Sequence, residues 1–74
     1  VSLRAYPNPA RHTLVVLMEG EAADLPLVVA DVSGKIMHTL AAQPAQQLDV
    51  SAWAPGMYFL RWGSAVQKVV VQWH

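Results

Sequence analysis

The chain has 74 residues, of which 54% are hydrophobic and 14% are charged, and its five basic residues balance five acidic ones. A chain of this length forms one domain with a thin core, because it buries only about 60% of the surface that it exposes when unfolded. The balanced charge excludes a basic nucleic-acid-binding surface, and the apolar content excludes a disordered chain. The sequence has no cysteine for a disulfide or a thiolate metal site, and no apolar run approaches the roughly 20 residues of a transmembrane segment.

The periodicity of the chain predicts a series of strands. Six segments of four to eight residues are rich in β-branched or aromatic residues and are bounded by Gly, Pro, Asp or Ser. In chain order they are Thr13–Met18, Leu27–Ala30, Ile36–Leu40, Gln47–Val50, Met57–Trp62 and Val66–Trp73, and Leu3–Tyr6 is a candidate seventh strand. Short strands separated by turns indicate an all-β fold, a small antiparallel immunoglobulin-like β-sandwich of six or seven strands.

Alternation along three of these strands assigns side chains to faces, because successive side chains of a strand point to opposite sides of a sheet. The sets that share one side are Leu14, Val16 and Met18, then Leu27 and Val29, and then Tyr58, Leu60 and Trp62. The opposite faces of the strands are also fairly apolar.

Proline and glycine mark the turns. Tyr6-Pro7-Asn8-Pro9 precedes Thr13–Met18, and its prolines restrict the residues before them to extended conformations, so we expect a stiff segment that fixes the direction of the tyrosine ring. Ser33-Gly34 predicts a tight hairpin whose flanking strands pair, since glycine adopts a positive φ without a steric cost. Pro55-Gly56 forms a further turn, and Trp53 just before it is placed to cap one end of the core.

The titratable residues do not form a catalytic or metal-binding pattern. Asp31 and Asp49 admit a reading as paired carboxylates, but each precedes turn-forming residues, and we favour hydrogen bonds to nearby backbone amides. The histidines at 12, 38 and 74 lie at no metal-ligand spacing, and the chain has neither a nucleophile-elbow motif nor a phosphate-binding loop. We therefore expect no catalytic residue, no metal and no cofactor, and predict that the chain is not an enzyme.

The aromatic residues admit two interpretations. Trp53, Trp62, Trp73, Tyr6 and Tyr58 are of the type that forms a flat platform for sugar rings in carbohydrate-binding modules. Large side chains also fill a thin core, and the spacing of Tyr58 and Trp62 along one strand face fits core packing. We favour the core, and both interpretations stay open for Trp73.

Four motifs follow one another in a set order: Tyr6-Pro7-Asn8-Pro9, then Val29 to Lys35, then Leu48–Ser51 with Pro55–Arg61, and finally Lys68-Val69-Val70-Val71. In this order and spacing they resemble the type A C-terminal sorting domain that type IX secretion systems read on their cargo. The resemblance covers nearly the whole chain.

The resemblance implies a non-catalytic secretion signal in the Gram-negative envelope. Cargo of this kind enters the periplasm through its own signal peptide, and an outer-membrane translocon recognises the C-terminal domain. A sortase-like cysteine protease then removes the domain, and the cargo stays at the cell surface or passes into the medium. Since the chain begins at Val1 without a methionine, we expect residues 1–74 to be one C-terminal domain excised from a larger cargo protein.

The resemblance and the turn chemistry together single out a set of recognition and fold residues. They are Tyr6, Pro7, Asn8, Pro9, Asp31, Gly34, Lys35, Pro55, Gly56, Tyr58, Lys68, Val69, Val70 and Val71. We expect Val66–Trp73 to lie at a sheet edge, where unpaired backbone groups would bind a translocon strand or form an edge-strand dimer. Lys35, Arg61 and Lys68 are candidate translocon contacts. The alternative function is an accessory β-sandwich of a secreted enzyme, either a carbohydrate-binding module or a fibronectin-like spacer.

Overall fold

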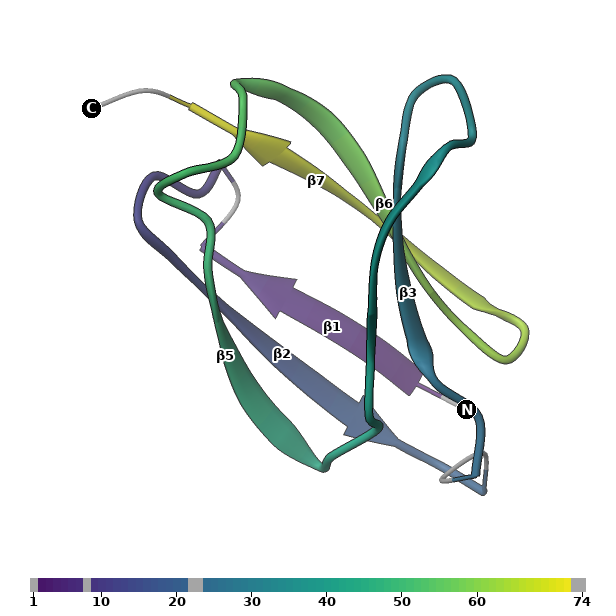
Figure 1. Ribbon diagram of the computed structural model, residues 1–74. Helices are drawn as coiled ribbons and strands as arrows, with labels where there is room; N and C mark the ends of the chain where they lie inside the picture. The colour runs from purple at the N-terminus through teal and green to yellow at the C-terminus, as the bar shows by residue number, and fades with distance from the viewer. Residues whose placement is uncertain (1, 8, 22–23, 73–74) are drawn as a thin grey trace.

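The computed structural model describes residues 2–7, 9–21 and 24–72 and contains seven strands (Figure 1). They are β1 (Ser2–Tyr6), β2 (Thr13–Glu19), β3 (Leu27–Asp31), β4 (Ile36–Leu40), β5 (Ala45–Asp49), β6 (Gly56–Trp62) and β7 (Ala65–Val71). Within the described ranges, the chain has no helix of the length and apolarity needed to cross a membrane.

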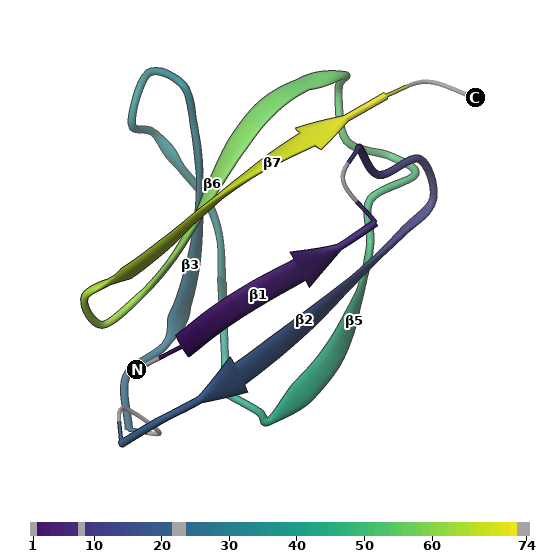
Figure 2. The same cartoon turned by 180° about the vertical axis from the view of Figure 1, so that it is seen from behind.

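The strands form two antiparallel sheets. Sheet A has the order β1-β2-β5, and sheet B has the order β4-β3-β6-β7. Figures 1 and 2 show the two sheets as the layers of a sandwich, with β1 and β7 side by side at one border. The predicted all-β sandwich is confirmed, and the candidate seventh strand forms as β1. The last strand ends at Val71, and Trp73 lies outside the described residues.

The core lies between the sheets and consists of the side chains that the alternation placed on common faces. Leu14, Val16, Leu27, Val29 and Leu60 are fully buried, and the other predicted members, Met18, Tyr58 and Trp62, are buried almost as completely. Burying a side chain of this size contributes about 1.5–3 kcal/mol relative to leaving it exposed. Because sheet B supplies strands from both halves of the sequence, the core joins residues that are far apart along the chain.

The proline segment connects β1 to β2, so it precedes the strand at Thr13 as predicted and follows the candidate seventh strand, which forms as β1. Asn8 lies outside the described residues, and Tyr6, at the end of β1, is half exposed on the outer side of sheet A. Ala10 follows the prolines and is fully buried. Its amide donates to the carbonyl of Val70 and its carbonyl accepts from the amide of Gln72, both at 2.8 Å, which fastens the segment to the end of β7.

The hairpin between β3 and β4 has the predicted glycine turn. Gly34 has a φ of +89° and donates its amide to the carbonyl of Asp31 at 3.0 Å, while the Asp31 amide donates to the Lys35 carbonyl at 3.0 Å. This is the pattern of a three-residue hairpin loop, in which a turn is followed by one residue in the left-handed region. The flanking strands pair as predicted.

Replacing Gly34 with alanine is expected to destabilise the domain by about 1–2 kcal/mol, the cost of holding a non-glycine residue in the left-handed region. A Cβ at this position would meet no atom within 4 Å, so the whole effect comes from the backbone. Urea unfolding of G34A against Val32→Ala, an exposed turn residue, measures the difference. Equal midpoints for the two variants would contradict the prediction.

Candidate functional site

Motifs that are distant in the sequence gather at one end of the sandwich, the upper end in Figure 1. This end, which we name the motif end, consists of Tyr6, Pro7, Pro9, Ala10, Asp31–Lys35, Asp49–Gly56 and Val70–Gln72. The register brings them together, since Gly56 pairs with Val71, Val71 is bridged to Ala10, and Asp31 pairs with Tyr58 close to Gly56. Figures 1 and 2 place the start of β1 at the opposite end.

Two aspartates hold turns at the motif end. Oδ1 of Asp31 accepts hydrogen bonds from the Ser33 hydroxyl at 2.6 Å, the Ser33 amide at 2.9 Å and the Lys35 amide at 3.1 Å. Oδ1 of Asp49 accepts from the Ser51 hydroxyl at 2.6 Å and the Ser51 amide at 3.0 Å. The turn-capping interpretation is therefore confirmed for both residues. The hydroxyl bonds, reinforced by the amide bonds, hold the pKa of each carboxyl below its ordinary value of 3.8.

These carboxyls are expected to make the domain less stable in acid. A carboxyl whose pKa is lower in the folded state contributes stability that is complete above its ordinary pKa, near pH 4, and that is lost as the pH falls through the folded-state pKa. Urea midpoints measured between pH 7 and pH 2.5 should fall below about pH 4. The fall should be smaller in the double variant Asp31→Asn, Asp49→Asn, whereas the control Asp24→Asn, outside both turns, should follow the parent chain. A double variant that follows the parent curve would refute this origin of the acid sensitivity.

Trp53 and Tyr58 close the core at the motif end. Tyr58 is 7% exposed and donates its hydroxyl to the carbonyl of Ala54 at 2.6 Å. The half-buried Trp53 ring lies 5.1 Å from the Tyr58 ring at a tilt of 51°, and it stacks on His38 with centroids 5.2 Å apart. Trp53 therefore caps one end of the core, as predicted, and the Pro55-Gly56 turn positions the strand that carries Tyr58. Gly56 has a φ of +151°, a conformation that glycine adopts most readily.

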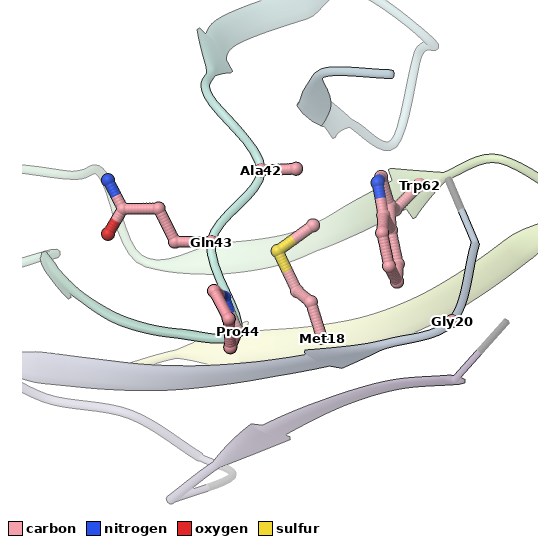
Figure 3. Close-up of a pocket in the computed structure, with 6 residues that line it drawn as sticks. All are labelled: Met18, Gly20, Ala42, Gln43, Pro44 and Trp62. Carbon is pink, nitrogen blue, oxygen red and sulfur yellow. The ribbon is translucent and has the colours of Figure 1, made fainter. Parts of the chain in front are cut away.

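Trp62 belongs to the interior, which decides between the two interpretations of this aromatic residue. It is 2% exposed and donates its indole N–H to the carbonyl of Leu25 at 3.2 Å. Figure 3 shows its ring beside Met18 in a pocket closed by Ala42 and Pro44, and this pocket holds about 80 Å³. Ligand sites are typically several times larger. The sugar-platform interpretation is therefore wrong for Trp62, and Trp73 lies outside the described residues.

The last strand combines core packing with a partly closed edge. Val69 and Val71 are buried, whereas Lys68 and Val70 belong to the alternate positions of β7, of which Lys68 is exposed. β7 is an edge strand, as expected. However, the carbonyl of Val70 and the amide of Gln72 already form hydrogen bonds with the main chain of Ala10. The expectation of an unpaired terminal edge is wrong at these two groups. No side-chain pattern singles out Ala10, because its bonds are made by the main chain.

The other edge of sheet B is β4, which pairs only with β3 among the described strands. Its side chains from Ile36 to Thr39 are exposed. The edge-strand dimer predicted for the last strand stays a prediction, and β4 is an edge of sheet B at which pairing would not displace Ala10.

Lys35, Arg61 and Lys68 are exposed. Lys35 lies in the Asp31 turn, and the other two lie on β6 and β7. Among the described residues, no group of three His, Asp or Glu side chains is placed to hold a metal ion.

The structure thus defines a small β-sandwich in which the turns of the motif end and the end of the last strand lie together. Residues 4–73 match a family described as the secretion system C-terminal sorting domain, so the chain belongs to this family of type IX sorting domains. The match confirms the family to which the four motifs pointed. No curated protein and no solved structure matches the chain. Family membership implies fusion to an N-terminal cargo, dependence on the type IX machinery, and export to the cell surface or the extracellular space.

Proposed function

We propose that residues 1–74 are one non-catalytic C-terminal domain of a larger cargo protein, and that its motif end is recognised by the outer-membrane type IX translocon. The observation that carries the proposal is the meeting of the four family motifs at one end of the sandwich although they lie far apart in the sequence. The cargo reaches the translocon from the periplasm, and a sortase-like cysteine protease then removes the domain.

The direction of the chain supports this assignment. β1 begins at the end of the sandwich opposite to the motif end, so cargo that precedes the domain is attached away from the shared turns. A translocon that binds the motif end therefore meets no obstruction from the cargo.

Cleavage upstream of Ser2 would release the cargo and leave the sandwich intact.

The experiment uses a fluorescent protein that carries an N-terminal signal peptide and ends in residues 1–74, in a strain with a working type IX system. The fusion should appear at the surface or in the medium, and the same reporter without the domain should stay in the periplasm. Equal retention of both reporters would overturn the proposal.

The processing step has its own readout. Exported reporter should have lost the mass of the 8.1 kDa domain, and in a strain without the sortase-like protease the domain should remain attached. Export with the domain still attached in both strains would support recognition and reject processing.

A further inference from the structure

The outer face of sheet B, which points away from the core, is apolar. Alternate positions that are paired across the sheet form this face, whereas the residues between them, such as Val29, Leu60 and Val69, are buried in the core. We name the set the outer B face. It consists of Val28, Ala30, Ile36, Thr39, Met57, Phe59, Arg61, Val66, Lys68 and Val70.

The exposure of this face is high for side chains of this kind. Ile36 and Val66 are each 60% exposed and Met57 is 39% exposed, Phe59 and Val28 are half-buried, and Ala30 is covered by its neighbours. An antiparallel sheet usually turns one face to the core and a polar face to water. Apolar side chains gathered on the second face are typical of an interaction surface.

Sheet A provides the comparison within the same molecule. The positions of its outer face are Ser2, Arg4, Tyr6, Thr13, Val15, Leu17, Glu19, Ala45, Gln47 and Asp49. These include acidic, basic and polar side chains, as expected for a solvated face. Four of these ten side chains are apolar, Tyr6, Val15, Leu17 and Ala45, against seven of the ten on the outer B face, so the outer B face is the more apolar of the two.

The outer B face is not flat, because it has a shallow hollow beside Arg61. Leu25, Pro26, Val28 and Ile36 line it, and Arg61 forms part of its wall. Leu25 is 43% exposed, so the hollow is lined by apolar side chains that water reaches. An apolar side chain that entered this open hollow would lie next to the guanidinium group.

The charges of the face select the partner. Its two charged residues, Arg61 and Lys68, are both basic, and none of its ten residues carries a carboxylate. Arg61 lies between Val28 and Val66 in the register, in the row of the face nearest the β6–β7 hairpin. An arginine flanked by apolar side chains is typical of a protein interface. A second copy of the same face would bring like charges together.

We propose that the outer B face is a docking surface for a protein of the type IX machinery, one that offers apolar side chains around a carboxylate that pairs with Arg61. This inference rests on the proposed sorting function and adds the surface and the chemistry of the partner. The motif end and the outer B face share β6 and β7, so one partner can contact both.

The test compares two charge reversals in the reporter fusion. Arg61→Glu should reduce export at least tenfold, because it places a carboxylate opposite the carboxylate of the partner. The matched control Arg4→Glu, an exposed arginine on the outer face of sheet A, should export as the parent does. Thermal unfolding of both purified fusions shows whether the domain remains folded.

An uncharged pair of variants tests the apolar part. The double variant Ile36→Thr, Val66→Thr keeps β-branched side chains and should also reduce export, whereas Val15→Thr on sheet A should not. Because both changes leave the charge unaltered, their effect is independent of the Arg61 result.

The outcomes separate the inference from the function on which it rests. Retention of the parent fusion in the periplasm refutes the sorting function, whereas export of the folded R61E and I36T/V66T variants at the parental level refutes the docking surface alone. Binding of the parent fusion to vesicles of phosphatidylglycerol and phosphatidylcholine that R61E abolishes would assign the face to a lipid surface and overturn the proposal. A dimer in size-exclusion chromatography that R61E dissociates would assign it to a second copy, with the same consequence.

Discussion

Replacing Leu60 with alanine is expected to remove about 2–5 kcal/mol of stability. Leu60 is fully buried in β6, between β3 and β7, where its side chain joins the packing of both sheets. A domain of this length has a total stability of about 4–11 kcal/mol, at about 0.05–0.15 kcal/mol per residue. The single change therefore removes a large share of the total, since a thin core cannot close the cavity.

Urea unfolding followed by tryptophan fluorescence measures this loss. Met57→Ala is the matched control, because Met57 lies on the same strand and is 39% exposed, and its loss should stay well below that of L60A. Equal losses in the two variants would show that the face assignment of β6 is wrong.

Removing residues 68–74 is expected to abolish both the folding of the domain and its export. The truncation deletes the buried Val69 and Val71 and the strand that pairs with β6, and it leaves the main chain of Ala10 without its partners. A cargo reporter upstream should remain fluorescent in the periplasm, because its fold does not depend on the domain. Circular dichroism of the purified truncated domain and fractionation of the cells measure the two effects.

Gln72→Ala provides the control for folding. It retains the whole of β7 and both main-chain bonds of Ala10, and its exposed side chain is all that is lost, so the thermal unfolding midpoint should match that of the parent domain. Parental export after removal of residues 68–74 would show that the last strand carries no part of the signal.

The local features of this fold could be predicted because they depend on short-range chemistry. Alternation with a period of two identified the buried faces of β2, β3 and β6, and Ser33-Gly34 identified the hairpin between β3 and β4. The Asp49 turn follows from the same tendency of aspartate side chains to accept hydrogen bonds from amides two residues ahead.

The long-range features could not be predicted in the same way. The bridge between Ala10 and Val71 consists of main-chain hydrogen bonds, so no side-chain type in the sequence predicts it. Alternation placed Trp62 on the core side of β6, but nothing in the sequence indicates that the carbonyl of Leu25, in a distant loop, accepts its indole N–H. The difference between the two outer faces also needed the register, because both faces of several strands are apolar in the sequence.

The most direct test of the sorting function compares one fusion in two strains. A fluorescent reporter preceded by a signal peptide and followed by residues 1–74 is produced in a strain with a working type IX system and in its sister without the translocon. Reporter at the surface or in the medium of the first strain, with retention in the periplasm of the second, is the predicted result. Retention in both strains, or equal release from both, would contradict the assignment of this domain as a type IX sorting signal.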